Sequence, residues 1–363
     1  MSRARMRGAC PTMRAMGGGA MSKKVEGELS AMLDGAQRAG SLLVPDTERV
    51  RAALRRRMGA GGIVSPERGM YARASWWEGL RPDARALAVM RGLQRLHPGW
   101  VFCGVSAALA HGADVSWGLL EKTHVAAPRS SWSVRSDRIA WHAVDCAEDR
   151  PVVRSGVRVT PLPRTTLDCL RSLSFREGMV VADHAVAHTS GGREELVSYL
   201  QAHAGRCHGV DRALGTLAWA DARAESGGES IARAVMIEQG FILPNLQAWV
   251  PDPLRPGRWF RVDFVWVRAD GRVIVGECDG KRKLLDPGLS GGRSVRQVLV
   301  DQREREGLIT AYDVSVVRFT FEEAACVSEL VRKLDLYGVP RLGSPLASTG
   351  EAPSIDWSAL LRH

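Results

Sequence analysis

One stretch of the chain, RVDFVWVRADGRVIVGECDGKRK at residues 261–283, constrains the fold more than any other. Two runs of β-branched and aromatic residues flank the dipeptide Asp270-Gly271, which is the pattern of two antiparallel strands joined by a turn. Inside these runs lie three acids, Asp263, Glu277 and Asp279. Burying unpaired carboxylates in a sheet costs several kcal/mol, so the sequence predicts that a cation neutralises this hairpin.

The length of the turn decides whether the three carboxylates converge. Glu277 and Asp279 share one face of their strand, because side chains alternate along a strand. A two-residue connection would pair Asp263 with Cys278 and put the aspartate on the other face. A three-residue connection pairs Asp263 with Asp279, provided that Gly271 takes a positive φ. A five-residue connection pairs Asp263 with Glu277. Convergence therefore requires a connection with an odd number of residues, or a bulge.

Two kinds of cation could compensate such a cluster. The simpler kind is a basic side chain, and Arg261, Arg303 and Lys281 are the candidates in the sequence. For three acids together we favour a divalent metal, because hard oxygen ligands suit Mg²⁺ or Mn²⁺. Phosphodiester hydrolysis requires such an ion to polarise the phosphate and to lower the pKa of a bound water. Lys281 shares the face of Asp279 if the strand continues, and we expect it to stabilise developing negative charge.

The order of helix, hairpin, helix, strand and helix, with the spacing D-x13-E-x-D, resembles the PD-(D/E)XK nuclease superfamily. The segments VDF at 262–264 and ECDG at 277–280 are similar to the pattern of very-short-patch repair endonucleases. This resemblance implies that Asp263 and Glu277 bind the metal and that Asp279 is a further acid. Superfamilies of this kind also contain members that only bind DNA.

This chain departs from the superfamily pattern at one position. The E-x-K form of the motif has a lysine where this chain has Asp279. The basic role must therefore pass to Lys281, or to a residue of the following helix such as Gln302 or Arg303.

Glu229, in the segment ESGGESIARAVMIEQGF, supports two interpretations. Nucleases of this kind often place an acid in their first helix, so the resemblance makes Glu229 a candidate catalytic residue. Ser226 precedes it by three positions, which fits a capping box in which the glutamate only holds the start of the helix. The sequence leaves both open.

A second charge-rich segment, PDTERVRAALRRRM at residues 45–58, predicts an amphipathic helix. A glycine-rich stop at residues 59–62 and a short β pair turning at Ser65-Pro66-Glu67 follow, so the order resembles a helix and its wing. An arginine-rich helix beside a basic hairpin suits DNA, and the alternative is a solvated basic face. The arginines expected to contact DNA are Arg51, Arg55, Arg56, Arg57 and Arg68.

The segments RGMYAR, SAALAHG and PLPRTTLDCL resemble the AbiEi-type antitoxin family, in which a winged helix precedes a mixed α/β domain. The resemblance begins at Val25 and extends to about Ala187. It implies that the partners include DNA, with a cognate toxin or the operator of a toxin–antitoxin system as the specific candidates.

Composition sets weaker limits. Six basic residues and no acid lie in the first 24 residues, so the net charge of +10 is only moderate support for DNA binding. The seven cysteines are scattered and lack C-x-x-C spacing, as is typical of reduced cytosolic thiols. No run of 18 apolar residues and no signal peptide is apparent, so we expect a cytoplasmic protein without membrane contact.

We therefore expect a mixed α/β (α+β) chain in five parts. These parts are a disordered basic extension (1–24), a winged-helix-like DNA-binding domain (25–75), an AbiEi-like mixed α/β domain (76–205), a restriction-endonuclease-like αβ sheet domain (206–343) and a flexible tail (344–363). The expected activity is metal-dependent hydrolysis of a DNA phosphodiester. The alternative is a non-catalytic transcriptional regulator or antitoxin that binds DNA.

Overall fold

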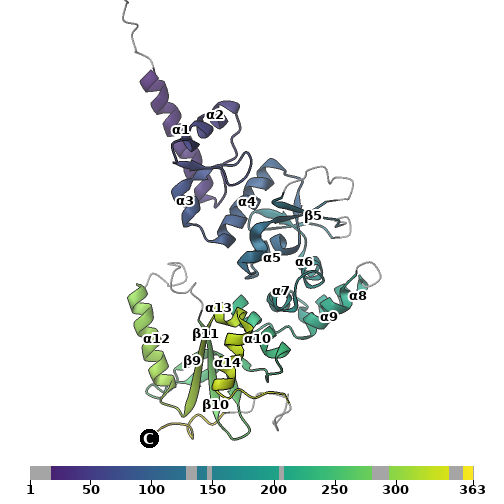
Figure 1. The fold of residues 1–363 in the computed structure, drawn as a ribbon, viewed down its shortest axis with the longest axis vertical. Helices are drawn as coiled ribbons and strands as arrows, with labels where there is room; N and C mark the ends of the chain where they lie inside the picture. The colour runs from purple at the N-terminus through teal and green to yellow at the C-terminus, as the bar shows by residue number, and fades with distance from the viewer. Residues whose placement is uncertain are drawn as a thin grey trace, which may run out of the picture. The chain divides into compact units, whose positions relative to one another are not determined.

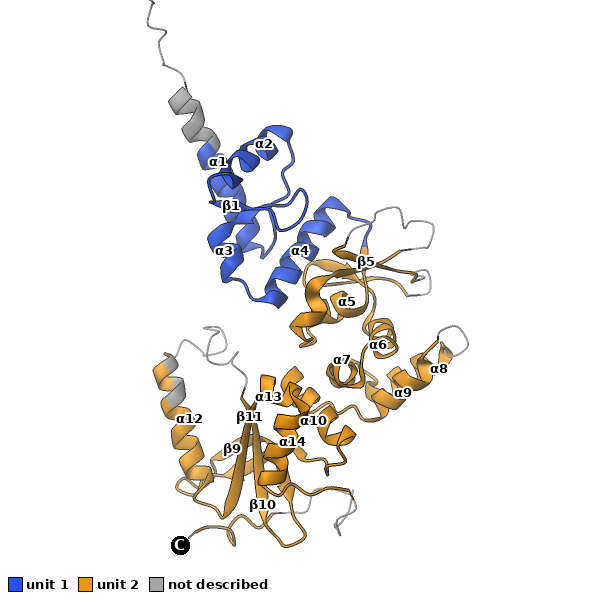
Figure 2. Cartoon of the chain, viewed as in Figure 1, with its two compact units in different colours: residues 1–100 blue, residues 101–363 orange. Residues whose placement is uncertain are grey.

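The computed structural model describes residues 18–127, 137–144, 149–203, 208–279, 294–342 and 355–362. The chain forms two compact units, residues 1–100 and residues 101–363, which are blue and orange in Figure 2. This division is coarser than the five expected parts. The described residues combine helices with a two-stranded, a five-stranded and a four-stranded sheet (Figure 1), which confirms the mixed α/β class.

The first unit contains the predicted arginine-rich helix and a short antiparallel pair. Helix α2 (Glu48–Met58) begins after Thr47, whose hydroxyl accepts a hydrogen bond from the backbone N–H of Val50. Strands β1 (Ile63–Val64) and β2 (Ala72–Arg73) follow the helix. The other helices of this unit are α1 (Gly18–Arg38), α3 (Ala74–Gly79) and α4 (Pro82–Leu96). Helix α1 begins inside the segment that was expected to be a disordered extension.

A small apolar core joins these elements of the first unit. It contains Leu29 and Leu33 of α1, Leu54 of α2, Ile63 of β1 and Tyr71. Leu43 and Tyr71 also form an antiparallel bridge, so the short pair is extended by one contact. The helix and the pair are therefore fixed to each other by burial.

The second unit begins with a five-stranded mixed sheet in the order β5-β4-β3-β7-β6. Its strands are β3 (Val101–Phe102), β4 (Thr123–Ala126), β5 (Ile139–His142), β6 (Val152–Arg154) and β7 (Val157–Val159). The helices of this part are α5 (Gly104–His111), the 3₁₀ helix η1 (Trp117–Glu121), α6 (Leu162–Leu170), α7 (Phe175–His188), α8 (Gly192–Ala202) and α9 (Val210–Ala218). Among the described residues, no helix is both long enough and apolar enough to cross a membrane.

The second unit ends with a four-stranded sheet in the order β11-β10-β9-β8. Strands β10 and β11 run parallel, and the other neighbours are antiparallel. The strands are β8 (Asn245–Pro251), β9 (Trp259–Val267), β10 (Val273–Asp279) and β11 (Val314–Thr320). The accompanying helices are α10 (Gly227–Glu238), α12 (Val295–Ile309), α13 (Phe321–Ala325) and α14 (Val327–Leu336).

Helices cover both faces of this four-stranded sheet (Figure 1). On one face Phe264 and Ile274 pack with α10, α13 and α14. On the other face Val273 and Val275 pack with Ile309 of α12 and with Tyr312. The sheet is thus the middle layer of three.

The structure differs from the predicted elements in this part at three places. Strand β8 was not predicted, because prolines lie at both ends of a segment with few β-branched residues. The single helix expected after the last strand of the predicted order is two helices that meet at Cys326. Ile355, Trp357 and Leu361, from the segment expected to be a flexible tail, pack against the core beside α12.

A buried ion pair connects helix α7 to helix α10. The guanidinium of Arg233 contacts both carboxylate oxygens of Asp183 at 3.0 and 2.8 Å, and the two side chains are 4% and 1% exposed. Asp183 also accepts the backbone N–H of Asp221, and Arg233 donates to the carbonyl of Trp219. The α10 helix, which carries Glu229, is therefore held by a network inside the second unit.

We expect Asp183→Ala to lower the free energy of unfolding by about 3–5 kcal/mol, because Arg233 would stay buried without a counter-charge. The matched control is Arg176→Ala, which removes the more exposed Arg176–Glu238 pair and should cost about 1 kcal/mol or less. Urea denaturation measures both changes. Equal losses in the two variants would contradict the burial of the Asp183–Arg233 pair.

Candidate functional site

The connection between β9 and β10 has five residues. Val267 pairs with Val273 and Phe264 pairs with Gly276, which leaves residues 268–272 as the loop. Gly271 in this loop has a φ of +82°, a conformation that glycine adopts without strain. Continued by one residue, the register sets Asp263 opposite Glu277, as the five-residue alternative predicted. Asp263 also accepts the backbone N–H of Cys278 at 2.8 Å.

The neighbouring ladder between β8 and β9 is interrupted at the level of Asp263. Pairs form on either side, Leu246 with Phe264 and Ala248 with Val262, and the two strands change faces between them. The interruption coincides with Gln247, whose φ of +54° is rare for a residue with a side chain. Backbone of this kind concentrates at functional sites, where the surrounding structure maintains the strain.

Glu229 lies at the start of α10 and makes the contacts with Ser226 that the capping interpretation predicted. Its backbone N–H and one carboxylate oxygen bond the hydroxyl of Ser226, and its other oxygen accepts the N–H of Glu225 and the amide of Gln247. Its side chain is buried. Burial and repulsion by Asp263 raise the pKa of Glu229, so it belongs to the acid cluster as well as to the helix cap.

A tight backbone approach brings α10 to the acids of the hairpin. A Cβ added to Gly228 would lie 2.8 Å from the sulfur of Cys278, so a larger residue there would force the helix and the strand apart. Cys278 stands between the two acids of β10. Glycine at position 228 therefore sets the separation between Glu229 and the end of the hairpin.

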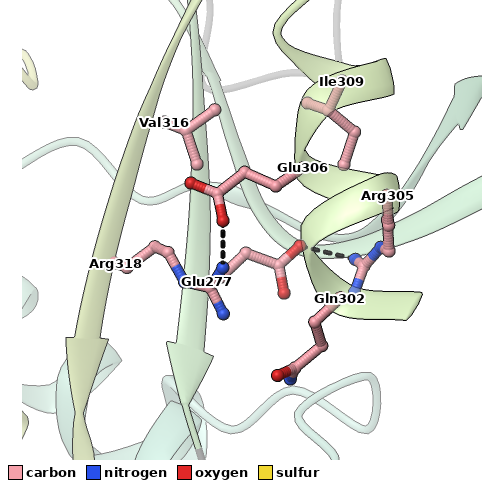
Figure 3. A pocket seen from close by; sticks show the side chains of 7 residues that line it. All are labelled: Glu277, Gln302, Arg305, Glu306, Ile309, Val316 and Arg318. Atoms are coloured by element: carbon pink, nitrogen blue, oxygen red, sulfur yellow. Dashed lines mark hydrogen bonds and ion pairs between the residues drawn. The ribbon is translucent and has the colours of Figure 1, made fainter. Parts of the chain in front are cut away.

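Glu277 is the most perturbed carboxyl group of the site. Burial raises its pKa to about 7, and repulsion by Asp263 and Asp279 acts in the same direction, while Arg305 opposes it. The guanidinium of Arg305 donates to Glu277 at 2.6 Å (Figure 3). It also donates to the carbonyl of Arg261. One guanidinium thus fails to compensate the charge of this buried carboxylate.

Asp279 has a guanidinium partner of its own. Arg318, on the neighbouring strand β11, donates to both oxygens of Asp279 at 2.9 and 2.6 Å. The same guanidinium reaches Glu306 of α12 at 2.7 Å, as Figure 3 shows. These acceptors raise the pKa of Arg318 above its ordinary value and keep it charged.

A shallow hollow, open to solvent, lies between β10, β11 and α12. Its polar lining consists of Glu277, Gln302, Arg305, Glu306 and Arg318, while Ile309 and Val316 form its apolar part (Figure 3). Gln302, which the sequence offered as a substitute for the missing lysine, lies in this lining. Arg303, the other helix candidate, is exposed.

The basic side chains that pair with the acids differ from those that the sequence suggested. The described structure supplies arginines, but they are Arg305 and Arg318, whereas Arg261 instead pairs with Glu225. Lys281 lies outside the described residues. The sequence missed both arginines because they lie on a later helix and a later strand. Helical spacing was the available signal, because Gln302, Arg305 and the buried Ile309 recur on one face of α12.

Carboxylate oxygens are the donor type that hard divalent cations prefer, but the described side chains do not gather around one point. Glu229, Asp263 and Glu277 supply oxygen ligands from adjacent elements, and the pKa of Glu277 stays raised with Arg305 in place. Among the described residues, no three acidic, histidine or cysteine side chains lie close enough together to hold a metal.

The five arginines of the first unit that were expected to bind DNA fall into two groups. Arg51 and Arg55 pair with Glu48, and Arg57 pairs with Glu26. The two others, Arg56 and Arg68, are exposed. Exposed guanidinium groups without an acidic partner are the better candidates for phosphate contacts.

We expect Glu277→Gln to stabilise the protein at pH 8 by on the order of 3 kcal/mol. Because the pKa of Glu277 rises from an ordinary 4.5 to about 7 on folding, the folded protein keeps a proton that the unfolded chain has released. Stability of the wild type therefore falls as the pH rises from about 4.5 to 7, and glutamine removes this loss.

Urea denaturation between pH 4 and pH 8 checks this expectation. The exposed Glu304 lies on α12 beside the site, so Glu304→Gln is the matched control and should leave the pH profile unchanged. Parallel pH profiles for the wild type and Glu277→Gln would contradict the raised pKa.

Comparison with known proteins gives a distant partial match. The uncharacterized proteins MT2308 and Rv2248, from two strains of Mycobacterium tuberculosis, are each 36% identical to this chain over 112 residues. The match covers 31% of this chain and 40% of each relative, so the chain spans less than half of their length. No family model matches the chain, and no solved structure matches it.

Proposed function

We propose that the four-stranded sheet and its helices form a nuclease domain that hydrolyses DNA phosphodiesters with Mg²⁺ or Mn²⁺. The observation that carries this proposal is the hairpin register, which brings Asp263 opposite Glu277, with the buried Glu229 beside them. Burial without full compensation is expensive for carboxylates, and a divalent cation relieves it better than one guanidinium does.

In this proposal Asp263 and Glu277 hold the cation, and Asp279 extends the set of oxygen donors. The cation would supply Lewis acidity and a bound water of lowered pKa. A bound cation would take over the neutralisation of Glu277 from Arg305, whose planar fork would then be available for a phosphate oxygen. Gln302, in the same hollow, can orient a water or a phosphate, and Lys281 is assigned the neutralisation of developing charge.

The second candidate function is a DNA-binding transcriptional regulator or antitoxin without turnover. One observation favours it: Glu277 and Asp279 already have guanidinium partners, which is the arrangement of a structural ion-pair cluster. The first unit, with its helix, short β pair and exposed Arg56 and Arg68, would then supply the DNA contacts. A cognate toxin or its operator would be the partner.

Plasmid cleavage distinguishes the two candidates. We expect the full chain to nick or linearise supercoiled plasmid in Mg²⁺ or Mn²⁺ and to stop in EDTA. Asp263→Asn and Glu277→Gln should each lower the rate by about a hundredfold or more, because each removes a proposed ligand charge. Glu304→Gln, which alters an exposed acid on the neighbouring helix α12, should cleave as the wild type does.

A thermal melt with and without metal gives a reading that does not require turnover. Mg²⁺ should raise the melting temperature of the wild type at pH 8, because a ligand that binds only the folded state stabilises it. The melting temperature of the Glu277→Gln variant should not change when Mg²⁺ is added. If the protein binds plasmid but does not cleave it, and if neither metal raises its melting temperature, it is the regulator and not the nuclease.

We expect the double variant Arg56→Ala/Arg68→Ala to weaken duplex DNA binding and to reduce the slope of log affinity against log salt by about 1 per lost phosphate contact. Arg51→Ala is the matched control, because Arg51 is paired with Glu48 at 2.9 Å. Fluorescence anisotropy at several salt concentrations measures both. An unchanged slope in the double variant would leave the basic segment as a solvated face.

A further inference from the structure

Two exposed tryptophans share one face of the β8–β9 pair. Trp249 lies directly opposite Arg261, and Pro251 lies opposite Trp259, so all four side chains project from the same side. Trp249 is 57% exposed and Trp259 is 51% exposed. We call these four residues the tryptophan face. The opposite side of the same strands is buried in the core beside α12.

The exposure of these two indoles requires an explanation. Large aromatic side chains bury more apolar area than any others, and clustered exposed ones mark interaction sites. Diagonal neighbours on antiparallel strands are separated by roughly 7–8 Å. That distance is about twice the van der Waals contact distance between flat carbon surfaces. Trp249 and Trp259 therefore present two neighbouring exposed aromatic surfaces on which a planar ring can stack.

The turn that joins β8 to β9 is held by hydrogen bonds and carries two arginines. The buried side chain of Asp252 accepts the backbone N–H groups of Leu254 and Arg255 at 2.9 and 3.2 Å. The backbone N–H of Asp252 donates to the carbonyl of Arg258. The side chains of Arg255 and Arg258 are each 53% exposed, and they pair with Glu304 at 3.5 Å and with Asp252 at 3.7 Å. Exposed pairs of this kind contribute about 1 kcal/mol or less, so a phosphate can compete for either guanidinium at the turn.

Strands β8 and β9, which carry the tryptophan face, also carry residues of the candidate site. Trp249 is two residues from Gln247, whose amide bonds Glu229. Arg261 is two residues from Asp263, and its carbonyl accepts a hydrogen bond from Arg305. A polymer that lies on the tryptophan face therefore reaches the carboxylates within a short length.

We propose that the tryptophan face binds an unpaired stretch of a DNA strand, with a base stacked on the indoles and the backbone held by the flanking arginines. This inference rests on the proposed function, because the nuclease proposal supplies DNA as the ligand. Flat apolar surface combined with positive charge matches the two parts of a nucleotide. Bases in an intact duplex are already stacked, so the face selects single-stranded, frayed or flapped DNA.

Anisotropy with a short labelled single strand in EDTA tests the proposal on the full chain. The double variant Trp249→Ala/Trp259→Ala should bind this strand about tenfold more weakly or worse, because base–aromatic stacking is lost. Binding of a blunt duplex should change less than twofold. The matched control is Trp117→Ala, because Trp117 is also 51% exposed but lies on η1, and it should bind as the wild type does.

A strand of abasic residues with the same phosphates provides a second measurement that needs no variant. The wild type should bind it more weakly than the normal strand, and the double variant should not distinguish the two strands. Equal affinity of the wild type for both strands would overturn the proposal. So would a double variant whose strand affinity is unchanged and whose sedimentation changes, because the face would then contact protein.

The nuclease proposal and the stacking proposal are tested by independent experiments, so either can be contradicted without the other. The binding assay contains no divalent metal, so its result does not depend on cleavage. Stacking without cleavage leaves a single-strand binder, whereas cleavage without stacking leaves a nuclease that reaches its phosphate by another route.

Discussion

Electrostatic repulsion between carboxylates at the end of one hairpin is the constraint on which this part of the molecule depends. Asp263 and Glu277 are brought together by the register, and the backbone N–H of Cys278 and the guanidinium of Arg305 each satisfy one of them. The rest of the site follows from this need. Helix α12 must lie across the sheet to deliver Arg305, and β11 must run parallel to β10 to deliver Arg318.

A cluster of carboxylates paired with arginines can have a structural or a catalytic role. Which role applies depends on how completely the arginines neutralise the carboxylates. An arginine on a flexible stem neutralises a carboxylate, but it carries one charge and pays the entropy of being held. The raised pKa of Glu277 means that this neutralisation is incomplete.

Sequence reasoning predicted the hairpin, because strand alternation is a local rule, but it left the length of the loop open between two, three and five residues. The structure has the five-residue connection. Sequence reasoning did not reach β8, whose place depends on pairing with β9 and not on its own composition. It also could not assign the partners of the acids, because Arg305 and Arg318 are distant in the chain and become neighbours only through the crossover between β10 and β11. The change of faces at Gln247 left no sequence signal, since glutamine is not a residue that favours positive φ.

The ion pair between Asp183 and Arg233 has a consequence for how this chain can be divided or inherited. A fragment that started near residue 206 would keep Arg233 on the inner side of α10 and lose the aspartate that faces it. Such a fragment would expose an uncompensated cation to apolar surroundings just one turn from Glu229. The four-stranded sheet is therefore not a portable module, and recombination between related chains could exchange it intact only if helix α7 moved with it.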